Sequence, residues 1–179
     1  MEEVEVKYRL DGPRHRDALR ARLRGMGARA LPPQQEENLL LDDAAGRLRR
    51  QGCVLRLRVL DGGPGGVLTW KGPAVFEGGV KIRREVETPV GDAPATLAIL
   101  EALGYRVALR YVKRREPWRL DGVEVALDAL DVGLFCEVEG ANRAEVEAMA
   151  RRLGLEEARI EPRPYPDLVK QARSRRGPS

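Results

Sequence analysis

The 179-residue sequence is 42% hydrophobic, which suits one domain with a real core and leaves little room for two full domains. Basic and acidic residues nearly cancel, because 32 Lys and Arg stand against 28 Asp and Glu. So many carboxylates among the arginines would repel a nucleic-acid backbone unless the two signs are segregated in space or bridged by metal. We therefore expect one domain over residues 1–174, a basic tail over 175–179, and no nucleic-acid partner.

The cysteine and histidine content limits the cellular compartment and the kind of metal site that can be expected. The chain has two cysteines, Cys53 and Cys136, and its start, MEEVEVKYRL, lacks the basic and apolar regions of a signal peptide, so we expect a cytoplasmic location. No run of about eighteen apolar residues occurs, so we expect no membrane partner. With His15 as the one histidine, a zinc site of nitrogen and sulfur ligands is excluded. Any metal must be held by oxygen.

Glycine-rich turns and helix-ending glycines divide the chain into strands and a few helices. The segment at 14–24 places Leu19 and Leu23 four residues apart among arginines and ends at Gly25, as an amphipathic helix does. Alternating polarity between turns predicts strands. In chain order we expect a strand at 2–10, a helix at 14–24, strands at 38–42, 53–60, 67–72 and 79–88, a helix at 95–103, strands at 106–116, 123–128 and 134–140, and helices at 143–153 and 164–173.

Charge recurs on one face of these strands. Successive side chains of a strand point to opposite sides of the sheet, so Glu3, Glu5 and Lys7 share one face of the first strand and the apolar residues between them share the other. The same pattern returns along the chain. The charged residues that share a face in later strands are Arg56 and Arg58; Lys71, opposed by Leu68 and Trp70; Lys81, Arg83, Glu85 and Glu87; Lys113 and Arg115; Glu124 and Asp128; and Glu137 and Glu139.

This recurrence predicts a closed eight-stranded antiparallel barrel, in an α+β fold that is mainly β. One such strand alone would be typical of an ordinary antiparallel sheet with one face exposed to solvent and the other packed on a core. Here the helices can cover the apolar faces from outside, so the charged faces would point into a wide polar interior. A buried charge is costly unless it is paired, hydrated or coordinated, so this lining is a functional hypothesis by default.

The first strand, Glu3-Val4-Glu5-Val6-Lys7, resembles the ExExK signature of the CYTH superfamily, or triphosphate tunnel metalloenzymes. That superfamily includes class IV adenylyl cyclases, thiamine triphosphatases and inorganic tripolyphosphatases. Six further blocks resemble it in order: ENLLLDDAAGRLRRQGCVLRLR (37–58), LTWKGP (68–73), VKIRREVE (80–87), YVKRREPW (111–118), VALDALDVGLFCEVEG (125–140) and PYPDL (164–168). The resemblance covers nearly the whole chain and implies a single tunnel domain of eight antiparallel strands over 1–174.

The resemblance also implies roles for the charged side chains. A carboxylate cluster that holds Mg²⁺ or Mn²⁺ would comprise Glu3, Glu5, Asp128, Glu137 and Glu139, with Glu85 and Glu87 as further candidates. Hard divalent cations prefer such oxygen ligands, together with substrate phosphates. A phosphate cradle would comprise Arg56, Arg58, Lys71, Lys81, Arg83, Lys113 and Arg115, where arginine adds bidentate contacts. The candidate catalytic residues are Lys7, which would position or activate the attacking group, and Lys71.

Two reactions suit such a tunnel: attack of water on the terminal phosphorus, or attack of the ribose 3′-hydroxyl on the α-phosphorus. We favour a triphosphatase acting on tripolyphosphate, thiamine triphosphate or a nucleoside triphosphate, because ENLLLDDAAGRL resembles the xxNxxFD segment of triphosphatases. Leu41 departs from that pattern by replacing the aromatic residue before Asp42. The alternatives are a class IV adenylyl cyclase and a non-catalytic polyphosphate- or nucleotide-binding module. Family members often pair, so a homodimer is left open.

Overall fold

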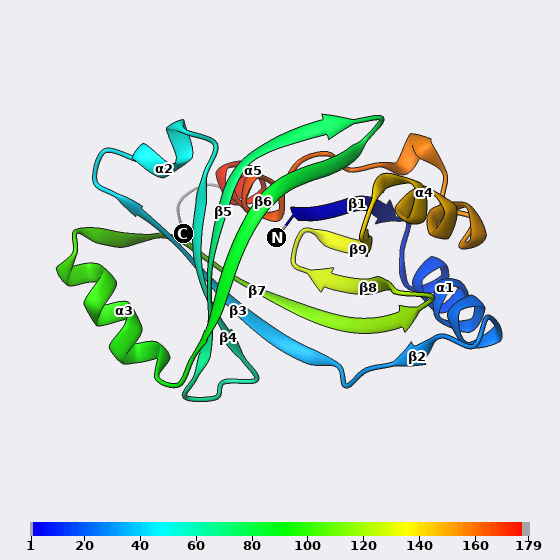
Figure 1. The fold of residues 1–179 in the computed structure, drawn as a ribbon, viewed down its shortest axis with the longest axis horizontal. Coiled ribbons are helices and arrows are strands. Elements are labelled where there is room, and N and C mark those ends of the chain that lie inside the picture. The colour runs from blue at the N-terminus through cyan, green and yellow to red at the C-terminus, as the bar shows by residue number, and fades with distance from the viewer. Residues whose placement is uncertain (1, 177–179) are drawn as a thin grey trace. The chain divides into compact units, whose positions relative to one another are not determined.

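The protein is described by a computed structural model over residues 2–176. Nine strands form one sheet in the order β2-β7-β3-β4-β5-β6-β1-β9-β8, and a further pairing joins β7 to β8 (Figure 1). The strands other than β2 therefore close into an eight-stranded antiparallel barrel, as the strand parity predicted. The strands are β1 (Glu2–Leu10), β2 (Arg29–Ala30), β3 (Gln34–Asp43), β4 (Val54–Leu60), β5 (Gly66–Glu77), β6 (Val80–Val90), β7 (Tyr105–Leu120), β8 (Val123–Leu130) and β9 (Gly133–Gly140).

Helices join the strands at a few points, and two of them begin at a polar capping residue. Asp92 accepts a hydrogen bond from the Ala95 amide, and Asn142 accepts one from the Glu145 amide, so each satisfies an N–H group that the first helical turn leaves open. The helices are α1 (Pro13–Gly25), α2 (Arg47–Arg50), α3 (Ala93–Ala102), α4 (Arg143–Arg152) and α5 (Tyr165–Arg176), with one 3₁₀ turn at Glu157–Arg159. None of the helices described within residues 2–176 is long and apolar enough to span a membrane.

Several elements are longer than the sequence patterns predicted, and the short ones were missed. β3 begins at Gln34 rather than at residue 38, because pairing with β4 extends the strand into a segment that is polar on both faces: Glu36 lies opposite Leu60 and Glu37 opposite Val59. The elements without a prediction are β2, α2 and the 3₁₀ turn. The predicted basic tail, 175–179, overlaps α5, because that helix includes residues 175 and 176. The other positions of the tail, 177–179, lie outside the described residues.

The chain divides into two compact units, and β5, β6 and β7 contribute residues to both. Within the described residues, the first unit comprises residue 2 and the segments 34–75 and 83–113. Its apolar cluster joins the outer faces of β3 and β4 to α3, through Leu39, Leu41, Leu57, Ala93 and Leu100. The predicted extent of a single domain, 1–174, stays a prediction.

The second unit comprises 3–33, 76–82 and 114–176, in which α1 packs against β9, and α4 packs against β8 and β9 (Figure 1). In β1 the apolar residues of one face enter its core, while Glu3 and Lys7 lie buried on the opposite face. Full burial of a side chain such as Leu23 or Val138 contributes about 1.5–3 kcal/mol, so this cluster is a main source of the unit's stability. The cluster includes Val4, Val6, Tyr8, Leu19, Leu23, Val125, Val138, Val146 and Met149.

Candidate functional site

A group of carboxylates lies on the charged face of β1 and β9 in the second unit. The two strands pair so that Glu5 lies directly opposite Glu139. Oxygen atoms of Glu3, Glu5 and Glu139 all lie within 4.8 Å of one another. Like charges opposite each other weaken a sheet, so the arrangement favours a bound cation. Three of the five predicted metal ligands thus converge, and their hard oxygen donors fit Mg²⁺ or Mn²⁺.

Lys81 supplies a positive charge to this group from β6. Its ammonium forms a hydrogen-bonded ion pair with Glu5. Burial alone would lower the pKa of Lys81, but the charges of Glu5 and Glu3 and the hydrogen bond to Glu5 outweigh it and raise the pKa. Lys81, predicted as a phosphate ligand, is therefore firmly cationic and already holds one carboxylate of the group.

Asp128 and Glu137, the other two predicted metal ligands, lie with Arg115. The Arg115 guanidinium donates to both Asp128 oxygens, at 2.9 and 2.7 Å, and also to Glu137. The Tyr165 hydroxyl donates to Asp128 at 2.9 Å. Asp128 is completely buried, and charge-assisted bidentate pairs of this kind are strong. In the structure Asp128 therefore orients Arg115 and Tyr165, and it lies outside the three-carboxylate group.

Lys7 lies opposite Glu137 across the β1–β9 pair and is held on two further sides. Its ammonium donates to the Arg163 carbonyl at 2.6 Å and lies 4.3 Å from the centre of the Tyr165 ring. The pKa of Lys7 is lowered, because the effect of burial is larger than the opposite effect of the Glu137 and Glu5 charges. These contacts fix the position of the ammonium, as the predicted positioning role requires.

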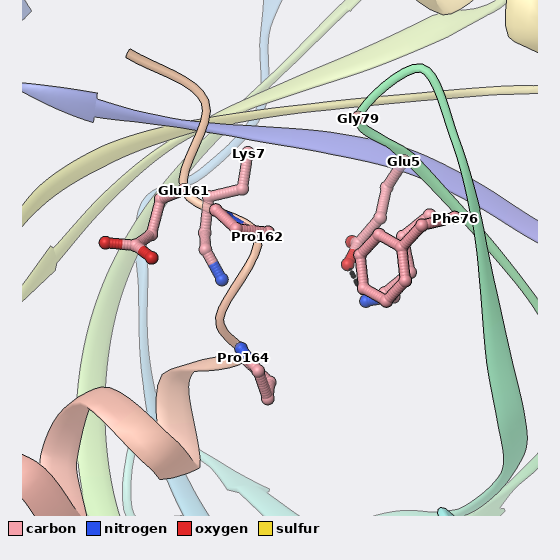
Figure 2. Close-up of a pocket in the computed structure, with 8 residues that line it drawn as sticks. Glu5, Lys7, Phe76, Gly79, Glu161, Pro162 and Pro164 are labelled. Atoms are coloured by element: carbon pink, nitrogen blue, oxygen red, sulfur yellow. Dashed lines mark hydrogen bonds and ion pairs between the residues drawn. The ribbon is translucent and has the colours of Figure 1, made fainter. Parts of the chain in front are cut away.

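Residues 160–165, which we name the carboxy-terminal strap, bring those contacts to Lys7 (Figure 2). A β-bridge joins Ile160 to Tyr8, and the Glu161 amide donates to the Lys7 carbonyl at 2.8 Å. The Glu161 carboxylate accepts from Arg163 at 2.6 Å and from Arg9 at 3.0 Å. Hydrogen bonds from Arg163 and from Arg9 lower the pKa of Glu161 to about 2 although burial opposes them. The strap is therefore anchored to β1 by these two backbone contacts and by the Arg9–Glu161 ion pair, while Arg163 pairs with Glu161 inside the strap.

In the first unit, two of the predicted phosphate-binding residues pair with a carboxylate that the sequence analysis missed. Glu36 is completely buried, with Arg58 at 3.4 Å and Lys113 at 3.3 Å. Lys71 pairs with Glu85 at 2.8 Å, and Arg58 also lies 3.9 Å from Glu87. Glu85 and Glu87, considered for a second metal, thus act here as partners of basic residues. Glu36 lies two residues before Asn38, on the same face of β3, and the predicted strand left it out because that strand began at residue 38.

Arg56 and Arg83 complete the cationic face of this unit. Arg56 donates to the hydroxyl of the buried Thr69 at 3.3 Å, across the β4–β5 pair. Arg83 is buried on β6. Asn38 lies opposite Arg58 in the β3–β4 register and is completely buried. Guanidinium and amide groups held in this way can contact the oxygens of a phosphate chain without first being ordered.

Asp42, in the same sequence block, has a local structural role. Its carboxylate accepts from the amides of Asp43 and Leu48 at 2.9 Å and of Arg49 at 3.1 Å. These bonds hold the first turn of α2 against the end of β3. The block ENLLLDDAAGRL therefore contributes the buried Asn38 from β3 and a loop whose conformation Asp42 sets, and Glu36 lies just before the block.

Comparison with known proteins places this geometry in a family. A family model described as CYTH domain matches residues 1–165. A relative named adenylate cyclase CyaB, from Aeromonas hydrophila, is 30% identical over 183 residues and covers 95% of this chain and 90% of its own. A candidate adenylate cyclase structure from Vibrio parahaemolyticus has a TM-score of 0.83 at 25% identity, covering 94% of this chain and 97% of its own.

A more distant structural match comes from Hippeastrum. It is a candidate adenylyl cyclase described as having a dominant triphosphatase activity. Its TM-score is 0.71 at 21% identity, and the match covers 86% of this chain and 88% of that one. At this identity the match shows the shared fold alone.

Proposed function

The chain belongs to the CYTH family, whose members are adenylyl cyclases or triphosphatases, and from that premise we propose that it is a metal-dependent triphosphatase. The observation that carries the proposal is the convergence of Glu3, Glu5 and Glu139 within 4.8 Å on one strand pair. A cluster with so much negative charge would repel a triphosphate on its own. It becomes useful when a divalent metal neutralises it and binds phosphate oxygens as well.

Mg²⁺ or Mn²⁺ would be held by Glu3, Glu5 and Glu139. When bound, the metal supplies charge neutralisation at phosphate oxygens. Lys81 limits the excess negative charge before metal and substrate arrive, because it already pairs with Glu5. Asp128 and Glu137 remain candidate ligands, but their contacts with Arg115 favour a role in holding that guanidinium. Glu85 and Glu87 likewise favour a role in orienting Lys71 and Arg58.

Phosphate oxygens would be bound by the buried basic side chains. These groups contribute most when they are ordered before the substrate arrives, because no reorganisation is then needed as charge shifts in the transition state. The ion pairs of Glu36 and Glu85 meet that condition for Arg58, Lys113 and Lys71. The proposed phosphate-binding residues are Arg56, Arg58, Lys71, Lys81, Arg83, Lys113 and Arg115.

Lys7 is proposed to orient the attacking group. Its ammonium is fixed by the Arg163 carbonyl and by the Tyr165 ring, so it can hold a water molecule or a phosphate oxygen in one direction. Lys71 is proposed as the second catalytic lysine, with Glu85 setting its position. In hydrolysis, water attacks the terminal phosphorus, the phosphoanhydride bond breaks, and orthophosphate leaves.

The test is product analysis of purified protein supplied with Mg²⁺ or Mn²⁺ and, in separate reactions, tripolyphosphate, thiamine triphosphate and ATP. Orthophosphate release supports the triphosphatase. Cyclic AMP with pyrophosphate from ATP would replace it by the second candidate, a cyclase, which the name of the Aeromonas relative favours. Metal-independent binding of polyphosphate without turnover would leave the non-catalytic module. A cytoplasmic location, the absence of nucleic-acid and membrane partners, and a homodimer stay predictions.

A further inference from the structure

We propose that a pocket of the second unit binds a flat aromatic ring, so that the substrate is an organic triphosphate rather than inorganic tripolyphosphate. The inference rests on the proposed function, because it names the substrate of the same site. The pocket has one wall from the β5–β6 hairpin and one from the carboxy-terminal strap, with charged residues of β1 between them (Figure 2). It is lined by Glu5, Lys7, Phe76, Gly79, Lys81, Glu161, Pro162 and Pro164.

The hairpin wall presents an aromatic side chain. Phe76 is 49% exposed, whereas Phe135, the other phenylalanine of the chain, is completely buried beside Tyr165. A phenylalanine that remains half exposed leaves apolar surface in water, which another apolar group can cover. Figure 2 shows the Phe76 side chain on the hairpin side of the pocket, across from Pro162 and Pro164 of the strap. Stacking of a nucleic-acid base on an aromatic side chain contributes about 1–3 kcal/mol, and every heteroaromatic ring has a suitable face.

The hairpin is held in place by a tight turn. Gly78 and Gly79 both have positive φ, 57° and 85°, which two-residue hairpin turns of the right twist require and which other residues adopt at a cost. A Cβ atom at Gly79 would lie 2.9 Å from Cδ1 of Ile160, so the turn packs directly on the start of the strap. The two walls are therefore in contact at one end of the pocket.

The strap wall combines two prolines with the charged Glu161. Pro162 and Pro164 have fixed φ angles and no N–H group, so they present ring carbons to the pocket without a donor that needs a partner. Between them, the Arg163 carbonyl accepts from Lys7, and Glu161 ties the strap to Arg9. A preformed wall lowers the entropy that a ligand loses on binding.

Charge at the same pocket defines the rest of the ligand. The ammonium groups of Lys7 and Lys81 lie on its β1 side, next to the carboxylate group that is proposed to hold the metal. A ligand that satisfies both features has an aromatic ring covalently joined to a phosphate chain. Tripolyphosphate offers nothing to Phe76, Pro162 or Pro164, so it would use the charged residues alone.

The experiment compares Phe76→Ala with Phe76→Trp, which keeps an aromatic face, and with Val75→Ala, which shortens an exposed neighbour outside the pocket. Binding of ATP, thiamine triphosphate and tripolyphosphate is measured by equilibrium dialysis in EDTA, and kcat/KM is measured with metal. Of ATP and thiamine triphosphate, the one that wild type binds more tightly is the ligand to follow. Phe76→Ala should weaken binding of that ligand about 10-fold, which matches the size of one stacking contact. Tripolyphosphate binding should change less than about two-fold, and the tryptophan and Val75 variants should resemble wild type.

The outcomes separate this inference from the proposed function. An equal loss for tripolyphosphate, or no loss for the ring-bearing ligands, would overturn the ring site even if hydrolysis is intact. If Phe76→Ala weakens binding of the ring-bearing ligands alone in EDTA, the ring site is supported even if no triphosphate is hydrolysed. The absence of hydrolysis would then count against the triphosphatase alone. Tighter binding of tripolyphosphate than of either organic triphosphate by the wild type would also overturn the inference.

Discussion

Glu5 and Glu139 lie directly opposite each other where β1 pairs with β9, although opposed carboxylates repel across a sheet. Lys81 offsets part of this repulsion through its ion pair with Glu5. A protein keeps such an arrangement when the charges have another use, and a divalent metal is the simplest one. The pair therefore links the stability of the apo protein to metal binding.

Glu139→Gln should weaken Mn²⁺ binding by more than about 10-fold, because the loss of even a residue that only supports a metal ligand can have an effect of that size. The apo protein should keep or gain thermal stability, because the repulsion between Glu5 and Glu139 is removed. Calorimetric titration with Mn²⁺ and thermal unfolding in EDTA measure the two effects. Glu147→Gln, on the surface of α4, is the matched control, because its carboxylate pairs with Arg143 in solvent. Unchanged Mn²⁺ affinity in Glu139→Gln would remove this residue from the metal site.

Arg83→Ala should lower kcat/KM for the best triphosphate substrate by about 10²–10³-fold, as loss of one preorganised donor to a transition state does. Arg84→Ala is the control on the next position of β6: Arg83 is buried, whereas Arg84 points the other way and is exposed. Steady-state kinetics of both variants, with circular dichroism to check folding, decide the matter. Equal effects of the two substitutions would contradict the assignment of Arg83 to the phosphate-binding face.

Glu36→Gln should destabilise the protein by about 3–5 kcal/mol, because removal of one charge of a buried pair leaves the other uncompensated. Here Arg58 and Lys113 would lose the carboxylate between them. The adjacent Glu37→Gln breaks a pair with the exposed Arg110, and surface pairs contribute less than about 1 kcal/mol. Urea unfolding of both variants compares the two free energies. A difference below about 1 kcal/mol would show that Glu36 is not needed to balance those cations.

Tyr165→Phe removes the hydroxyl that donates to the buried Asp128 and keeps the ring beside Lys7. We expect a stability loss of about 1–3 kcal/mol with kcat changed little, because the loss leaves a buried acceptor short of one bond. Tyr165→Leu also removes the ring, so kcat should fall further while KM changes less. Urea unfolding and steady-state kinetics separate the two effects. Identical kcat values in the two variants would argue against a role of the ring in positioning Lys7.

Glu161 should contribute stability that disappears in acid. Because its folded pKa of about 2 lies below the ordinary value of 4.5, the contribution is complete above pH 4.5 and is lost as the pH falls toward 2. A shift of this size corresponds to about 3 kcal/mol. The difference in unfolding free energy between wild type and Glu161→Gln should therefore shrink between pH 4.5 and pH 2. Glu156→Gln, which alters an exposed pair, should show no such trend, and a constant difference for Glu161→Gln would contradict the prediction.

The alternation of charged and apolar residues along single strands was sufficient to predict the barrel. Val4, Val6 and Tyr8 had to face a core, so Glu3, Glu5 and Lys7 had to share the other face, because side chains alternate with a period of two. Seven of the eight expected strands had that pattern, and with helices to cover the apolar side a closed antiparallel sheet was the consistent arrangement. Strand ends were less predictable, since pairing with β4 rather than local preference extends β3 through Glu36.

Which charges meet was decided by the tertiary structure. Strand register places Glu5 opposite Glu139. The fold also brings Arg115 to Asp128 and Glu137. From the sequence alone, either a metal or a guanidinium could have been the partner of these two carboxylates. The strap depends entirely on contacts far apart in sequence, such as the bond from Lys7 to the Arg163 carbonyl. Local patterns report which face a side chain occupies, whereas ion pairs and pockets depend on distances of a few ångströms between segments that only folding brings together.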